Sequence, residues 1–259
     1  MSTFLFDKTV FGPVMSRRLG VSLGMNLLPN NRKVCSFDCI YCECGLNGEL
    51  GDNKDVMPTR MEVKERLAAK LIDMQKEGLK PDVITFAGNG EPTLHPEFSA
   101  IINDTIELRN AHCPEARIAV LSNASRLHKK EVVEALLKID DNIQKLDSGL
   151  KETILRLDQP NYAFDLEKTI AQLVDFKGQL IIQTMFVAGE LEGKDISNLS
   201  DADINSWLDA LDIIKPEKVM IYTIERDTPY NSLKKVPLDT LKAIANKAEK
   251  RGHIVSVSG

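Results

Sequence analysis

Short runs of β-branched and other apolar residues alternate with amphipathic stretches along most of this chain. From about residue 59 onward, apolar residues after each run recur at three- and four-residue spacing, as on one face of a helix. This alternation is typical of βα units, in which helices cover a parallel sheet. The predicted strands are 21–27, 83–87, 118–122, 143–146, 180–187 and 219–223, and a seventh could follow at 254–257.

The stretches between the strands predict helices at 60–77, 95–111, 129–139, 165–176, 201–214 and 238–251. The first helix has a clear start, because Thr59 as N-cap and Glu62 three residues later can form a capping box. Six βα units are two short of a closed eight-stranded barrel. We therefore predict an α/β fold, a partial (β/α)6 TIM-like barrel with a parallel sheet and helices outside, as one domain over residues 1–259.

Composition narrows the class of protein. With 43% hydrophobic and 27% charged residues, the chain is typical of a globular domain and not of a disordered or coiled-coil protein. A net charge of -5 argues against non-specific binding to nucleic acid, although a local basic patch stays possible. No apolar stretch is long enough to span a membrane, and the first residues lack the pattern of a secretory signal peptide. We expect a protein of the reducing cytoplasm, with no membrane partner.

Four of the five cysteines fall within ten residues, which is the strongest chemical signal in the chain. The run Cys35-Ser36-Phe37-Asp38-Cys39-Ile40-Tyr41-Cys42-Glu43-Cys44 gives Cys-x3-Cys-x2-Cys with one extra cysteine. In a reducing compartment, such crowding indicates metal binding more often than disulfides. The run lies in a segment without helical or strand periodicity, about 29–58, and loops of that length are usually functional.

Three interpretations of the cysteines compete. A structural zinc site needs a second pair of ligands, and the four histidines are isolated. Packing as small apolar residues fits poorly with a polar, glycine-flanked loop. An iron-sulfur cluster held by Cys35, Cys39 and Cys42 would leave one iron free to bind substrate or cofactor. A zinc-stabilised binding protein without redox chemistry remains the alternative.

With Tyr41 as the aromatic residue, Cys-x3-Cys-x-aromatic-Cys resembles the signature of the radical S-adenosylmethionine (SAM) superfamily. The resemblance implies a 4Fe-4S cluster whose open iron binds SAM. It further implies reductive cleavage of SAM to a 5'-deoxyadenosyl radical, which abstracts hydrogen from a substrate. Tyr41 would help to seat the cofactor. A low-potential flavodoxin or ferredoxin would then be the electron donor.

A second motif supports the resemblance. Residues 86–93 resemble the superfamily's Gly-Gly-Glu-Pro turn, in which Gly88, Asn89, Gly90 and Glu91 would bind the methionine ammonium. Glycines allow a backbone to approach a ligand closely, and a carboxylate is a natural partner for an ammonium group.

Polar residues at the ends of later strands are further candidates for cofactor contacts. Ser122 and Asn123 fall where family members contact the ribose and carboxylate of the cofactor, although turn formation would also explain them. Asp147 and Gln183 could direct polar groups into the barrel. Arg226 could neutralise a carboxylate or could be a solvated loop residue.

The segments around residues 10–24 and 145–149 look like the compact branch similar to the wyosine-forming tRNA-modifying enzymes. Those enzymes carry a second cluster on N-terminal cysteines, whereas no cysteine precedes Cys35 here. Arg17 and Arg18 could bind a phosphate or carboxylate, or form a surface charge pair. Cys44 is either a spectator or a thiol donor, and Cys113 is expected to be a partly buried apolar residue.

The substrate is left open. The resemblance implies a nucleoside or RNA base, although the net negative charge of the chain does not favour binding of tRNA. A glycyl residue of a protein, as in activating enzymes, would suit the wide mouth of an open barrel. A small molecule is equally allowed.

Overall fold

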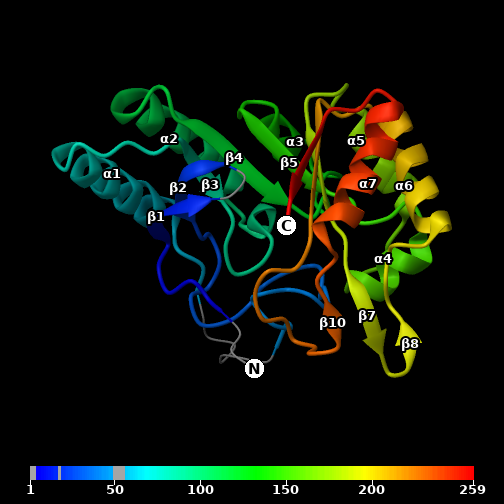
Figure 1. Ribbon diagram of the computed structural model, residues 1–259. Coiled ribbons are helices and arrows are strands. Elements are labelled where there is room, and N and C mark those ends of the chain that lie inside the picture. The colour runs from blue at the N-terminus through cyan, green and yellow to red at the C-terminus, as the bar shows by residue number, and fades with distance from the viewer. Residues whose placement is uncertain (1–3, 17–18, 49–55) are drawn as a thin grey trace.

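A curled eight-stranded sheet with helices on its outer side forms the body of the protein (Figure 1). The computed structural model describes residues 4–16, 19–48 and 56–259. The strands of this sheet, in spatial order, are β1 (Val10–Ser16), β2 (Gly20–Met25), β3 (Val83–Phe86), β4 (Arg117–Ser122), β5 (Asp141–Lys145), β6 (Ile181–Met185), β9 (Lys218–Tyr222) and β11 (Val255–Ser258).

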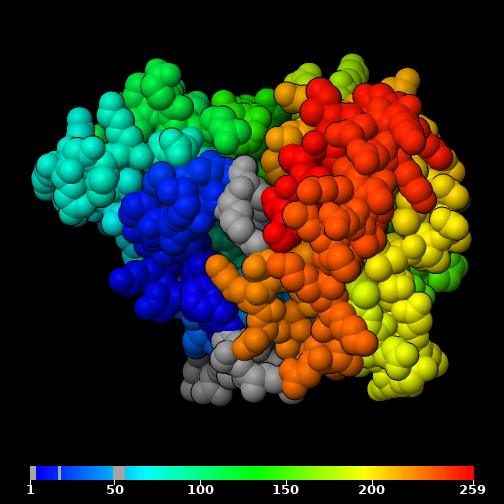
Figure 2. Space-filling view, viewed as in Figure 1, coloured from blue at the N-terminus to red at the C-terminus, as the bar shows by residue number. Residues whose placement is uncertain are grey.

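The sheet is a half-barrel that does not close. The six strands from β2 to β9 are parallel and follow one another in chain order. At the edges, β1 pairs antiparallel with β2, and β11 pairs parallel with β9. In the space-filling view, the blue segment that carries β1 and β2 lies left of the centre and the red segment near the end of the chain lies right of it (Figure 2). The predicted partial (β/α)6 barrel and its additional last strand are confirmed.

The helices are α1 (Arg60–Lys76), α2 (Phe98–His112), α3 (Lys130–Leu136), α4 (Lys151–Leu157), α5 (Leu166–Val174), α6 (Asp201–Ile214) and α7 (Leu238–Lys250). The capping box at the start of α1 is confirmed, since the Thr59 side chain accepts the Glu62 N–H and the Glu62 carboxylate accepts the Thr59 N–H. The apolar face of α1 is buried against the sheet. Across the described ranges, no helix is both long and apolar enough to cross a membrane.

The structure differs from the sequence prediction in four places. Two helices, α4 and α5, separate β5 from β6 where one was expected. A 3-10 turn at Pro92–Leu94 precedes α2, which begins at Phe98 instead of residue 95. Strand β1 was not predicted, because Gly12 and Pro13 interrupt its pattern. A small sheet of β7 (Ala188–Leu191), β8 (Lys194–Asp195) and β10 (Leu233–Lys234) has strands too short to show periodicity.

Helix α6 packs against the sheet through a buried tryptophan and a close backbone contact. Trp207 is fully buried, donates its Nε1 hydrogen to Thr184 Oγ1 at 2.9 Å, and lies edge-on to Phe186. A Cβ on Gly149 would lie 2.1 Å from the Ser206 carbonyl oxygen. Glycine at this position therefore lets the loop after β5 approach the backbone of α6.

Replacing that glycine should destabilise the fold. In Gly149→Ala the added methyl group must displace backbone, so we expect the free energy of unfolding to fall by about 1–3 kcal/mol. Urea unfolding followed by circular dichroism measures the change. The exposed Lys151→Ala, two residues away, should stay within about 0.5 kcal/mol of wild type. Equal stability of Gly149→Ala and wild type would contradict the tight contact.

Candidate active site

A cavity of about 240 Å³ lies at the carboxyl ends of the parallel strands, where the cysteine loop covers the half-barrel. Sites in parallel α/β folds are usually at this end of the sheet. The predicted site residues that line the cavity are Cys35, Cys39, Tyr41, Cys42, Gly88, Gly90, Glu91, Ser122, Asn123 and Gln183. Asn89 and Asp147 do not line it.

The three motif cysteines reach this cavity through consecutive turns of the loop. The Cys42 N–H donates to the Cys39 carbonyl at 3.0 Å, and the Gly45 N–H donates to the Cys42 carbonyl at 3.0 Å. Cys44 lies in the same turns but does not line the cavity. Its thiol is directed at the Gly88 carbonyl, 3.5 Å away. Cys113 is buried at the end of α2, as expected.

A buried lysine that sequence reasoning missed lies beneath the cysteines. The Lys33 side chain is 1% exposed, and its Nζ donates to Asp38 Oδ1 and to the Gly45 carbonyl, both at 3.0 Å. Burial lowers the pKa of Lys33, but the facing cysteines and Asp38 outweigh it and raise the pKa above its usual value. A cation held here stabilises negative charge on the neighbouring sulfur atoms.

Asn47 completes this support. Its backbone N–H donates to Asp38 Oδ1 at 2.9 Å, and its side-chain oxygen accepts the Cys35 N–H at 3.1 Å. Its side-chain nitrogen donates to the carbonyls of Cys35 and Phe37. We call Lys33, Asp38 and Asn47 the loop brace. The available sequence signals were a lysine two residues before the first cysteine and an aspartate inside the motif.

Loss of the loop brace should lower the free energy of unfolding of the metal-free protein. Asp38→Ala leaves the buried Lys33 ammonium without its carboxylate. We expect a loss of about 2 kcal/mol in the free energy of unfolding, below the usual cost of breaking a buried pair because Asp38 is 26% exposed. Asp73→Ala, which breaks an exposed pair with Lys76, should cost less than about 1 kcal/mol in the same urea titration. Similar losses in both variants would show that the brace carries little stability.

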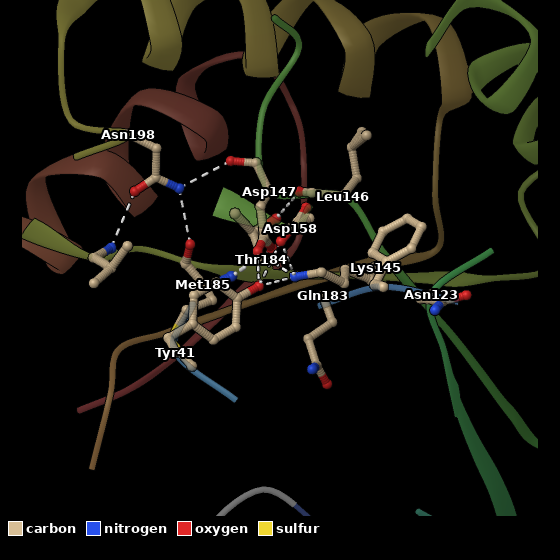
Figure 3. A network of polar contacts seen from close by, with 12 residues as sticks. Tyr41, Asn123, Lys145, Leu146, Asp147, Asp158, Gln183, Thr184, Met185 and Asn198 are labelled. Carbon is tan, nitrogen blue, oxygen red and sulfur yellow. Dashed lines mark hydrogen bonds and ion pairs between the residues drawn. The ribbon is translucent and has the colours of Figure 1, made fainter. Parts of the chain in front are cut away.

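A second buried charge network joins the cysteine loop to β5 and α4 (Figure 3). The Tyr41 hydroxyl lies within hydrogen-bond distance of Asp147 and 3.0 Å from Asp158 Oδ1. Lys145 Nζ contacts the Tyr41 hydroxyl and forms ion pairs with both carboxylates, at 3.1 Å for Asp158. The Lys145 ammonium also lies 4.7 Å from the centre of the Tyr41 ring.

This network decides which residue faces the cavity. Lys145 lines it, whereas Asp147 is turned away and accepts the Met185 N–H at 2.9 Å. Burial lowers the pKa of Lys145, but Asp147 and Asp158 raise it well above its usual value, so Lys145 stays charged at neutral pH. Burial also raises the pKa of Asp158 above its usual value, and the nearby Lys145 opposes that shift. In Figure 3, Gln183 points away from the network, and its amide donates to the Tyr222 hydroxyl at 2.8 Å.

The glycine turn packs closely against the start of the cysteine loop. A Cβ on Gly90 would lie 1.9 Å from the Val34 carbonyl oxygen, and one on Gly88 would lie 2.3 Å from Asn26 Oδ1. Glycine is therefore required at both positions because the turn lies close to other parts of the protein, whether or not a ligand is bound. The Asn89 side chain is fully buried and donates to the carbonyls of Phe6 and Pro29 at 2.9 and 2.8 Å. The Asn89 side chain therefore links the segments around Phe6 and Pro29 and does not face the cavity.

Glu91 and Asn123 link the glycine turn to the cysteine loop. The Glu91 carboxylate accepts the Thr93 N–H at 3.0 Å and the Asn123 N–H at 2.6 Å. Burial raises the pKa of Glu91 although these donors lower it. The Asn123 side chain donates to Ser36 Oγ at 2.9 Å and approaches the Cys35 sulfur at 3.5 Å. The Ser122 hydroxyl accepts the Ala124 N–H, as its turn-forming interpretation predicted.

Arg226 lies outside the cavity. It pairs with Glu43 at 2.9 Å, stacks 5.7 Å above the Phe4 ring, and is 62% exposed. The suggested carboxylate-binding pair Arg17 and Arg18 lies outside the described residues.

Comparison with known proteins identifies the class. The family model of the Radical SAM superfamily matches residues 33–165, about half of the chain, including all three motif cysteines. The chain belongs to the radical SAM superfamily.

Two curated relatives are similar over most of the chain. A GTPase Obg of Brachyspira hyodysenteriae is 31% identical over 228 residues, which are 86% of this chain and 31% of that protein. A UPF0026 protein of Helicobacter pylori strain J99 is 30% identical over 230 residues, 87% of this chain and 69% of that protein. The chain thus spans only part of the length of these relatives.

Solved radical SAM structures share the fold. A radical SAM methyltransferase from Sphaerobacter thermophilus has a TM-score of 0.64 at 13% identity, over 92% of this chain and 65% of its own. Streptococcus suis SuiB bound to S-adenosylmethionine has a TM-score of 0.63 at 17% identity, over 91% and 50%. Archaeal TYW1 has a TM-score of 0.53 at 14% identity, over 88% of this chain and 71% of its own.

Proposed function

We propose that Cys35, Cys39 and Cys42 hold a 4Fe-4S cluster, and that SAM binds beside it at the cavity that these cysteines line. The observation that carries the proposal is the meeting of these three cysteines with the Gly88–Glu91 turn around one cavity. Superfamily membership implies both groups. When bound, they supply one-electron cleavage of SAM to a 5'-deoxyadenosyl radical that abstracts hydrogen from a substrate.

The donor set fits a cluster better than a single ion. A structural zinc ion is normally held by four Cys or His side chains, whereas the described wall of the cavity offers three cysteines and no histidine. Three thiols that share the wall of a cavity, with the buried Lys33 beside them, suit a larger anionic cluster. This argues against the zinc-stabilised alternative.

The other wall residues suit a polar, charged cofactor. Lys145 presents a cation that can pair with a carboxylate, while Asn123 and Gln183 present amides. Glu91 orients the glycine turn through its bonds to Thr93 and Asn123. Leu121 and Ile143 contribute apolar wall that excludes water from the space between these groups.

We further propose a nucleoside or RNA base as substrate, supported by the resemblance to the wyosine-forming branch. A glycyl residue of a partner protein is the second candidate, favoured by the open edge between β1 and β11. Flavodoxin or ferredoxin would serve as the electron donor. The likeness to a GTPase covers only 31% of that protein and carries no proposal of GTPase activity for this chain.

Iron analysis tests the cluster. After anaerobic reconstitution, wild type should hold about four iron atoms per chain. Cys39→Ala removes one of three ligands and should hold under about one, with loss of the brown colour. Cys44→Ala is the matched control from the same loop and should retain the wild-type content. One zinc and no iron in the wild-type protein would overturn the proposal.

Cofactor binding tests the glycine turn. In Glu91→Gln an amide NH2 group replaces one carboxylate oxygen and faces a backbone N–H donor. The turn should therefore shift. We expect SAM affinity to fall at least about tenfold, or 1.4 kcal/mol. Equilibrium binding of labelled SAM to the reconstituted protein measures it, and iron content should be unchanged. The exposed Glu97→Gln should bind like wild type. Unchanged SAM affinity in Glu91→Gln would remove Glu91 from the site.

A further inference from the structure

A second cavity, of about 520 Å³, lies beside the active site and shares only Cys35 with it. Its wall is formed by the loop after β4, the segment before α5 and α5 itself. Its volume is within the range of small-molecule binding sites. Nothing in the proposed SAM chemistry uses it.

The cavity carries unpaired positive charge. Arg126 and Lys168 both line it, and neither has a carboxylate partner among the described residues. The Arg126 Nε atom is buried and without a hydrogen-bond partner. The one acid in the described wall, Asp165, accepts the backbone N–H of Lys168 at 3.0 Å and so caps α5. A buried guanidinium donor without a partner favours an anionic ligand.

An aromatic ring stands in the same wall. Tyr162 is 41% exposed, and its ring packs beside those of Phe37 and Phe164, with ring centres 6.2 and 6.3 Å away. Burial, followed by Glu91 and Cys35, raises the pKa of Tyr162 to about 12, so its hydroxyl stays neutral. A fixed ring with an open side is a stacking platform for a base.

We propose that the second cavity binds a nucleotide, with Arg126 and Lys168 on its phosphate ester and Tyr162 stacked on its base. Cations beside an accessible aromatic ring are the combination that nucleotides and single-stranded nucleic acid require. The phosphate ester belongs either to a free nucleotide or to a single strand. The net charge of -5 does not oppose this, because the cationic groups are gathered in one concave place.

The site is also coupled structurally to the cysteine loop. The Asn161 N–H donates to the Ser36 carbonyl at 2.9 Å, and the Asn161 side chain donates to the Cys35 carbonyl at 3.1 Å. The hydroxyls of Ser36 and Ser125 are 2.6 Å apart. A ligand in the second cavity would therefore touch the same stretch of backbone that presents Cys35 to the active site.

Titration calorimetry on the full chain, before and after reconstitution with iron and sulfide, tests the proposal. Guanosine 5'-monophosphate should bind at least tenfold more tightly than guanosine, because guanosine lacks the phosphate. Arg126→Gln and Lys168→Gln should each weaken that binding at least tenfold. Tyr162→Ala should weaken binding of the nucleotide while leaving that of inorganic phosphate unchanged. Lys130→Gln, an exposed cation outside the cavity wall, is the matched control and should bind normally.

A short single-stranded oligoribonucleotide identifies the source of the phosphate. Binding of the oligonucleotide alone, with the same dependence on Arg126, indicates a strand, and binding of the mononucleotide alone indicates a free nucleotide. The proposal would be overturned by measurable but equal affinities for guanosine and its monophosphate, by full affinity in Arg126→Gln for the probe that binds wild type, or by no binding of any probe. Because the metal-free protein is measured too, these outcomes are separate from failure of the cluster to form.

Discussion

The buried ion pairs between Lys145 and the two carboxylates of Asp147 and Asp158 hold the cysteine loop on the half-barrel. The end of α4 adds two backbone bonds, because the carbonyls of Leu157 and Asp158 accept N–H groups of the loop at 2.9 Å. A buried charge left without its partner is costly, so the loop, β5 and α4 keep one arrangement relative to one another. Tyr41, inside the cysteine motif, contacts all three charged groups and transmits that constraint to the neighbouring cysteines.

Two lysines place positive charge around the cysteines in different ways. Lys33 lies under the loop and is held by Asp38, whereas Lys145 approaches from the sheet and is shared by two carboxylates. A 4Fe-4S cluster on three thiolates would bring net negative charge into a space with little water. Lys33 compensates that charge locally. Lys145 is more nearly neutralised, which leaves it suited to orient a carboxylate at the cavity wall.

The two cavities share a wall built from the first cysteine and its neighbours. Cys35 lines both cavities, whereas Ser36 and Asn161 line the second cavity, where the Asn161 N–H donates to the Ser36 carbonyl. Asn123 contacts both Ser36 and Cys35. A ligand in the second cavity would therefore affect the position of Cys35, which holds one corner of the proposed cluster. This gives a physical route by which a bound nucleotide and the chemistry at the cluster could depend on each other.

The order of βα units and the gathering of Cys35, Cys39 and Cys42 in one loop could be predicted from the sequence, because periodicity and short spacing are local properties. The contacts between residues far apart in the sequence could not be predicted in this way. Asp158 reaches Tyr41 only because α4 ends beneath the loop, and Asn89 turns away from the cavity because Phe6 and Pro29 offer it carbonyls. Which polar side chain faces a cavity depends on the partners available after folding, so only the tertiary structure put Lys145 at the wall and Asp147 behind it.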